Sequence, residues 1–250
     1  MSSSRGRRWR QVQAQVQTAM ARPRDEIEPE GGPAHQALNL LDALSVSLRR
    51  REEARLWRLR AGALSVLGPA RDAEAVAAYQ EAVLRAPRDG RLHWEAAVYH
   101  KWRGRWDEAW RLNAVALARM PSLRGALWTQ AQLATVRGDA ALATGIWRSL
   151  GHGMHAPRCG ALPESQVQPT FLVRLPCRPA ATGPSFEMLP LQATSPCHGV
   201  LTAPTFVAAG IDFGDQLLFD AAPAAWVQQA GVPVPCFPVV ALLQRAQVRT

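Results

Sequence analysis

The chain has 250 residues, with 29 basic and 20 acidic side chains and a formal net charge of +9. A chain of this length can bury one large core or two modest ones, so folding does not depend on disulfides. No apolar run approaches the ~20 residues that span a bilayer, and no apolar core follows the basic N-terminus, so the sequence predicts neither a membrane span nor a secretory signal.

The positive charge is unevenly distributed along the chain. Residues 1–33 carry six basic and four acidic side chains, residues 34–150 carry eighteen and eleven, and residues 151–250 carry five of each. All basic residues except Lys101 are arginine, a bias that a GC-rich bacterial genome would produce. The charge indicates either a solvated basic face of helices, which we favour, or a surface for nucleic acid or the ribosome with salt-dependent affinity.

Residues 1–33 are predicted to form a basic N-terminal arm and linker. Apolar residues recur at helical spacing in Trp9, Val12, Val16 and Met20, which indicates a short amphipathic helix over residues 9–21. The segment 25–32, rich in acidic residues, proline and glycine, is typical of a linker. The arm is either a partly ordered tail or a helix docked on the body, and an arm that grips acidic lipid or RNA is a further alternative.

A helical domain is expected over residues 34–150. Its first helix would bury one face, made of Ala37, Leu38, Leu41, Leu44 and Leu48. Three helical hairpins follow, which pair residues 56–67 with 73–85, 91–102 with 106–118, and 123–136 with 140–150. Gly68, Gly104 and Gly138 lie where each first helix must end in a left-handed residue, and Pro87 and Pro121 stop two of the second helices.

Small and aromatic residues in these hairpins recur with a period of 34. Ala75, Ala82 and Pro87 reappear as Ala109, Ala116 and Pro121, and Trp94, Ala97, Gly104 and Ala109 reappear as Trp128, Ala131, Gly138 and Ala143. Over residues 54–150 this pattern resembles the tetratricopeptide repeat (TPR) family, whose unit is a 34-residue helix-turn-helix. The departures are two extra residues in the first turn, Asn113 in place of an aromatic residue, and the absence of the tyrosine of the first helix.

The resemblance implies that the first helices of the hairpins line a concave groove that holds a partner. The groove positions are Arg55, Arg58, Arg91, Trp94, Val98, Lys101, Trp102, Trp128 and Gln132. A basic and aromatic set favours an acidic peptide with apolar residues, because arginine pairs with carboxylates through two hydrogen bonds and tryptophan buries a large area. The alternative is that Trp94 and Trp128 only pack against neighbouring helices. The set contains no asparagine, which disfavours the carboxylate clamp of chaperone-binding members of the family.

After a linker at residues 151–168, a small β-rich domain of no recognised family is expected over residues 169–250. Short apolar stretches at 170–175, 186–191, 200–203, 216–219 and 239–243 are the predicted strands. Residues 211–215 are predicted to form the turn before the fourth strand, and Pro190, Pro233 and Pro235 to confine their strands to sheet edges. The predicted fold class is therefore α+β.

Three weak chemical candidates lie in this half. One is the set of carboxylates Asp212, Asp215 and Asp220, in which Asp215 follows Gly214 and is better explained as a turn former. His152, His155 and Cys159 could supply three metal ligands, but no fourth ligand is evident. Cys197 and His198 are adjacent, whereas a catalytic pair must meet in space with a third, orienting group such as Asp215.

We expect a bacterial, cytoplasmic adaptor or accessory subunit with reduced cysteines, which binds a protein or peptide and needs no cofactor. The alternatives are a nucleic-acid- or ribosome-associated protein and an enzyme whose site lies in the β-rich domain.

Overall fold

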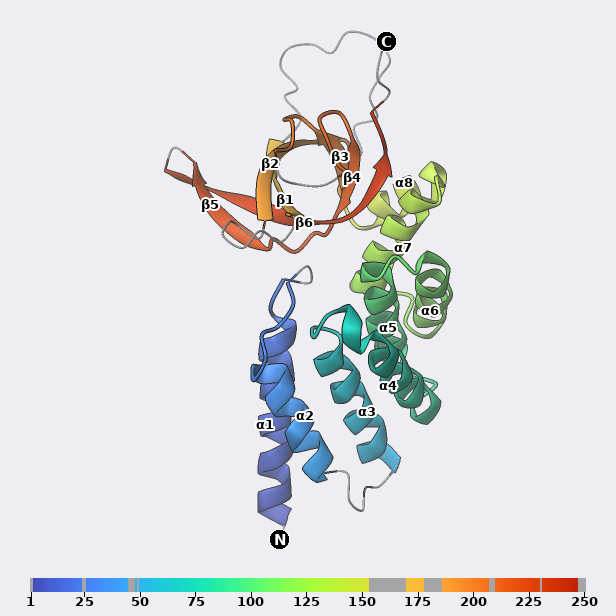
Figure 1. The fold of residues 1–250 in the computed structure, drawn as a ribbon. Coiled ribbons are helices and arrows are strands. Elements are labelled where there is room, and N and C mark those ends of the chain that lie inside the picture. The colour runs from blue at the N-terminus through green and yellow to red at the C-terminus, as the bar shows by residue number, and fades with distance from the viewer. Residues whose placement is uncertain are drawn as a thin grey trace. The chain divides into compact units, whose positions relative to one another are not determined.

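The computed structural model describes residues 2–23, 26–44, 48, 50–152, 170–177, 186–206, 210–229 and 231–246. Helices occupy the first part of the chain and strands the second, which confirms the predicted α+β class (Figure 1). The chain divides into two compact units, Met1–Ala126 and Leu127–Thr250. Among the described residues, no helix is both long enough and apolar enough to cross a membrane.

The first unit is a stack of helices. They are α1 (Ser2–Met20), α2 (Pro33–Leu44), α3 (Arg50–Leu64), the short 3₁₀ helix η1 (Pro69–Arg71), α4 (Asp72–Arg85), α5 (Gly90–Trp102) and α6 (Trp106–Arg119), followed by the start of α7 (Arg124–Val136). Helix α3 packs on α4, and α5 packs on α6. The first two predicted hairpins are therefore present, with α3 beginning six residues before its predicted start.

Local signals account for these helix ends. Asp89 caps α5, since its carboxylate accepts a hydrogen bond from the backbone N–H of Leu92 at 3.1 Å. Gly104 follows α5 with a φ of 65°, the left-handed conformation that glycine adopts without steric cost. These helices carry alanines with no exposed surface: Ala75, Ala82, Ala97, Ala109 and Ala116.

The N-terminal segment is a docked helix. Helix α1 extends over 19 residues, longer than the predicted 9–21, and packs on α2 and α3. Trp9, Val12, Val16 and Ala19 are buried in the same core as residues of α2 to α6. Of the alternatives for residues 1–33, the structure thus supports the helix docked on the body, because its apolar stripe has a partner surface.

The second unit joins two helices to a closed sheet. After α7 comes α8 (Ala140–Ser149), and the strands are β1 (Thr170–Pro176), β2 (Phe186–Ala193), β3 (His198–Leu201), β4 (Gln216–Phe219), β5 (Ala225–Gln229) and β6 (Val232–Gln244). The strand order is β1-β2-β3-β4-β6-β5, and a parallel pairing of β1 with β6 closes the first five of these into a ring. All other pairings are antiparallel.

The strands differ from the prediction in two places. Strand β5 was not predicted, and β6 begins at Val232, seven residues before the predicted start, with Pro233 and Pro235 inside it. The expectation that proline confines its strand to an edge is wrong for Pro190, since β2 pairs with both β1 and β3. The Pro190 carbonyl accepts from the N–H of Thr202, which lies just beyond the end of β3. An N–H at residue 190 would face the same position, so its absence removes no bond between β2 and the residues of β3.

The ring of strands encloses an apolar core. Alternate residues of the strands, Val173, Leu175, Leu189, Leu191, Leu201, Leu217 and Phe219, are buried there. Three aromatic rings pack together at this core, with Phe171 and Phe219 centroids 4.8 Å apart and Phe171 and Phe237 centroids 4.9 Å apart; Phe171 and Phe237 are partly buried. This alternation of buried and outward residues is the usual arrangement of a closed sheet.

Helix α7 lies against the outside of the sheet. The side-chain amide of Gln132, which has no exposed surface, donates to the carbonyl oxygen of Phe219 at 3.1 Å. The Thr135 hydroxyl lies 3.7 Å from the sulfur of buried Cys197. Residues 127–136 therefore belong to the core of the second unit, whereas the sequence predicted a domain boundary at residue 150.

Candidate functional site

A pocket of about 520 Å³ lies between α3, the end of α4 and the start of α5. We call this pocket the basic cleft. Its lining residues are Ala54, Arg55, Arg58, Arg85, Ala86, Asp89 and Leu92. Three guanidinium groups and one carboxylate thus surround a partly apolar floor.

Arg58 joins α3 to α5 across the basic cleft. Its Nε donates to Glu95 Oε2 at 2.7 Å and its Nη2 to Glu95 Oε1, a two-bond pairing, and Asp89 lies 3.8 Å from Nη1. The hydrogen bonds that Arg58 donates to Glu95 raise the pKa of Arg58 against the opposing effect of burial. Arg58 therefore stays protonated, and much of its charge is already neutralised.

Arg85 at the end of α4 is compensated in the same way. It pairs with Glu81 one turn earlier and with Glu53 of α3, whose Oε2 lies 3.1 Å from Nε. The Trp57 ring, with its centroid 5.5 Å from the guanidinium, packs beside it. Neither Arg85 nor Asp89 was in the predicted groove set, because both lie near the Pro87 connection and not on a first helix.

Arg55 differs from the other two arginines of the cleft. Its Nη2 donates to the neutral amide oxygen of Gln13 at 2.7 Å, and its guanidinium lies 4.9 Å from the centroid of the Trp9 ring. The contacts found for Arg55 within the described residues include no carboxylate. Arg55 is exposed, and among the described residues no carboxylate compensates its positive charge at the cleft.

The other predicted groove residues of the first unit differ in how far their side chains are exposed. Arg91 is exposed, and Val98 and Trp102 are half-buried. Trp94 is half-buried, with its ring against the backbone of Gly125 at the start of α7. Lys101 is only 3% exposed and lies 5.5 Å from the Trp102 ring, so its side chain does not line an open groove.

The two predicted groove residues on α7 are packed inside the second unit. Trp128 packs edge to face on Trp147 of α8, with ring centroids 4.7 Å apart. This contact agrees with the alternative that Trp128 packs against a neighbouring helix. Gln132 is buried and bound to the backbone of β4, which corrects its placement in the groove. Gln132 lies at a position of α7 that corresponds to a groove position in the repeat. In the structure the sheet covers this face of the helix.

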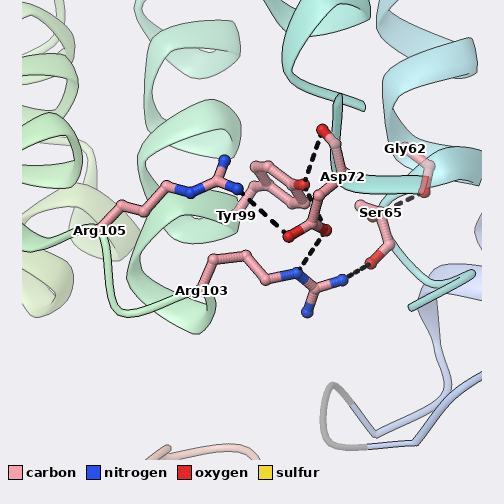
Figure 2. Close-up of polar contacts among 6 residues, drawn as sticks. All are labelled: Gly62, Ser65, Asp72, Tyr99, Arg103 and Arg105. Atoms are coloured by element: carbon pink, nitrogen blue, oxygen red, sulfur yellow. Dashed lines mark hydrogen bonds and ion pairs between the residues drawn. The ribbon is translucent and has the colours of Figure 1, made fainter. Parts of the chain in front are cut away.

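A polar cluster ties the two hairpins of the first unit together (Figure 2). The Asp72 carboxylate accepts from the Tyr99 hydroxyl at 2.8 Å, from Arg103 Nε at 2.7 Å and from Arg105 Nη2 at 3.3 Å. Arg103 also donates to the Ser65 carbonyl at 3.4 Å. These residues come from the start of α4, the end of α5 and the turn before α6, so the cluster sets the spacing between consecutive hairpins.

The cluster is built to stay ionised. Burial opposes the charge on Asp72, but hydrogen bonds from Arg103 and Tyr99 hold its pKa below the usual value. Burial and the hydrogen bond to Asp72 raise the pKa of Tyr99 to about 12, so the phenol keeps its proton. The Asp72 carboxylate is paired with two guanidinium groups and a phenol from neighbouring elements, which indicates a structural role. The sequence marked neither Asp72 nor Tyr99, because the two are 27 residues apart.

Of the residues of the predicted enzyme site, Cys197 and His198 meet at one hydroxyl and Asp215 is engaged elsewhere. The Ser195 hydroxyl is hydrogen-bonded to Nδ1 of His198, and the Cys197 sulfur lies 3.7 Å from that same hydroxyl. Asp215 instead accepts from the N–H of Asp212 at 3.0 Å and from that of Ala246 at 2.7 Å, as the turn former that the sequence predicted. Its carboxylate is thus used to hold the loop.

His198 lines a second, smaller pocket of about 320 Å³ in the second unit. The other lining residues come from α7, α8, β4 and β6: Thr135, Val136, Gly138, Ala140, Ala143, Thr144, Trp147, Gln216, Leu243 and Gln244. Burial lowers the pKa of His198. Among the described lining residues none is a carboxylate that could orient this imidazole.

The predicted metal ligands are only partly within the described residues. His155 and Cys159 lie outside them. His152 packs its ring against Trp128 and Trp147, with centroids 5.3 Å and 6.1 Å away. The residues that the structure describes contain no group of three histidine, cysteine or acidic side chains that could hold a metal ion.

The sequence matches no protein family model, and no curated protein matches it.

Proposed function

We propose that the basic cleft binds an acidic segment of a partner protein, and that the chain acts as a cytoplasmic adaptor or accessory subunit in a bacterium. The observation that carries the proposal is Arg55, an exposed cation at the cleft whose contacts within the described residues are with a neutral amide and a tryptophan ring. A carboxylate from outside would supply the anion that this guanidinium lacks.

The stacking of the helices supports an array of the TPR type. Arg55 of α3 contacts Trp9 of α1, and Arg58 of α3 contacts Glu95 of α5, so the first helices of successive hairpins lie next to one another. The fully buried alanines allow this close approach. Stacked first helices are the surface on which such arrays hold their partners.

The cleft favours a mixed acidic and apolar ligand. Leu92 and Ala54 offer an apolar floor, and the arginines stand at its sides. Arg58 and Arg85 are already paired with glutamates, so a ligand carboxylate gains most from Arg55. Asp89 would repel a second carboxylate placed next to it, which favours an apolar residue at that end of the ligand.

The test uses the full chain and a labelled peptide that alternates glutamate with leucine, measured by fluorescence anisotropy at fixed ionic strength. Arg55→Ala removes the uncompensated charge, and Arg71→Ala is the matched control, because Arg71 is an exposed arginine paired with Glu74 outside the cleft. Loss of a hydrogen-bonded charge pair costs about 1.5–3 kcal/mol, so Kd should rise roughly 10- to 100-fold for Arg55→Ala. Arg71→Ala should change it less than about twofold.

Two results would refute the proposal. One is the absence of binding by the wild-type chain, and the other is an equal loss in both variants, which would show nonspecific attraction to a basic protein.

A nucleic-acid role has a separate observation in its favour. Arg7, Arg8 and Arg10 are exposed on α1. If they bind RNA, the affinity of the chain for a single-stranded RNA should fall steeply with salt, and Arg7→Ala with Arg8→Ala should flatten that slope. Salt-independent or undetectable RNA binding removes this alternative.

A further inference from the structure

The hairpin of β5 and the first residues of β6 carries an open sheet edge. Among the described residues, β5 pairs with β6 alone, from Ala225 opposite Cys236 to Gln229 opposite Val232. In Figure 1 this hairpin extends away from the ring that the other strands form with the rest of β6. Among the described strands, β5 is the one that lies outside the ring.

The ladder determines which backbone groups of β5 face outward. The carbonyls of Cys236 and Pro238 accept from Ala224 and Asp220, so the even-numbered residues of β6 direct their backbone groups toward the edge that β4 and β5 occupy. The odd-numbered residues of β5 therefore bond to β6. The N–H and C=O groups of Trp226 and Gln228 are left facing the open edge.

The two edges of this hairpin differ in their residue composition. Pro233 and Pro235 occupy positions of β6 whose N–H would point away from β5, so the β6 edge cannot offer these donors to an incoming strand. The β5 edge, Ala-Trp-Val-Gln-Gln, contains neither proline nor a charged side chain. Natural sheets usually block exposed edges with such residues. The β6 edge is therefore blocked, whereas the β5 edge has no partner strand among the described residues.

We propose that β5 is a dimerisation strand, which pairs antiparallel with β5 of a second copy of this chain. The charge pattern favours a second copy as the occupant. Between residues 216 and 244 the only charged side chain is Asp220, so two copies with a net charge of +9 meet through a segment without positive charge. Trp226 is 65% exposed, and a partner strand would cover it.

The register of the pairing follows from the open groups. A two-fold axis at Val227 places Trp226 of one copy opposite Gln228 of the other, in both directions. Each such pair exchanges two backbone hydrogen bonds, so all four outward groups of each strand are used. Such an interface is the same surface on both copies, as two-fold symmetry requires. Its five-residue length predicts a weak, concentration-dependent dimer.

Sedimentation velocity of the full chain from about 5 to about 300 µM tests the proposal over the range expected of a small interface. Gln228→Pro removes an outward N–H without removing a bond to β6, and it should raise the dimer Kd at least about tenfold. Gln228→Thr is the matched control, because threonine keeps the N–H and suits a strand, and its Kd should stay within about twofold. Far-UV circular dichroism verifies that both variants fold.

A second pair of variants keeps the test decisive if proline perturbs the hairpin. Trp226→Lys places a charge on the open edge and should abolish the dimer. Val232→Lys places the same charge on the same hairpin but on β6, at a side chain that is also 60% exposed, and should leave the dimer intact. A wild-type chain that stays monomeric throughout, or a dimer that tolerates Trp226→Lys, overturns the proposal.

The register has its own test. In the two-fold pairing the Cα atoms of the two Val227 residues form a non-hydrogen-bonded pair about 4.5 Å apart, within disulfide range. Val227→Cys should therefore give a covalent dimer on mild oxidation, with the bond between the two introduced cysteines identified by peptide mass mapping. The wild-type chain under the same oxidation controls for its own cysteines. A Val227→Cys chain that forms no such bond contradicts the pairing around Val227.

Discussion

Asp72 provides the sharpest test of how the hairpins of the first unit are held together. Replacing it with alanine removes the acceptor for Tyr99, Arg103 and Arg105 at once. Of its contacts within the described residues, the Arg103 side chain, 16% exposed, would keep the Ser65 carbonyl at 3.4 Å and the face of the Tyr99 ring at 5.4 Å. A largely buried guanidinium would therefore lose its counterion.

The size of the effect can be bounded. Losing one hydrogen bond to a charged group costs about 1.5–3 kcal/mol, and breaking a fully buried ion pair costs about 3–5 kcal/mol. Because Asp72 and Arg103 retain 17% and 16% exposure, water compensates part of the loss. We expect Asp72→Ala to lower the free energy of unfolding by about 2–4 kcal/mol.

Urea unfolding of the full chain, followed by the helical circular dichroism signal, measures this change. With a slope of about 2 kcal/mol per molar urea, the midpoint of the helical transition should fall by about 1–2 M. Glu74→Ala is the control, because Glu74 is also in the first turn of α4 but is 52% exposed and pairs with Arg71 on the surface. It should cost less than about 1 kcal/mol. Equal shifts for the two variants would refute the role of the cluster and leave only the loss of negative charge at the helix start.

Two further predictions concern buried histidines and close packing. Burial lowers the pKa of both His100 and His198, so below about pH 6.5 the unfolded chain takes up protons more readily than the folded chain, and the free energy of unfolding should fall there. Thermal unfolding measured from pH 7.5 to 5 should show this decline, and the decline should be less steep in His198→Gln. A melting temperature that does not change with pH would contradict the prediction. A Cβ at Gly125 would lie 2.8 Å from Cε2 of Trp94, so Gly125→Ala should destabilise the chain by about 1–3 kcal/mol. Gly145→Ala, which meets nothing within 4 Å in α8, should stabilise it by about 0.5–1 kcal/mol, and calorimetry that finds the same sign for both would exclude the packing explanation.

The positions of most elements were predictable because their signals are local. Helical periodicity, a glycine such as Gly104 after the helix and a proline such as Pro87 beyond it act within one or two turns. Strand β4 and the turn before it were located correctly, since Gly214 and Asp215 carry the turn chemistry themselves. Strand β5 was missed, because Ala-Trp-Val-Gln-Gln has no clear alternation and is a strand only through its pairing with β6.

The candidate site was predicted in part for a related reason. The resemblance to TPR arrays placed Arg55 and Arg58 in one groove, and both line the basic cleft, whereas Arg85 and Asp89 reach it through the fold of the hairpin. Gln132 had the spacing of a groove residue and is buried instead.

The sequence by itself determined the helices, several strands and the basic character of the first unit, because periodicity, turn residues and charge are properties of short segments. Only the tertiary structure decided that α1 is docked in the core, that Gln132 binds the backbone of β4, and that β1 meets β6 in parallel to close the sheet. These outcomes depend on which surface covers a side chain or an edge. That surface comes from residues dozens of positions away, and no local pattern specifies it.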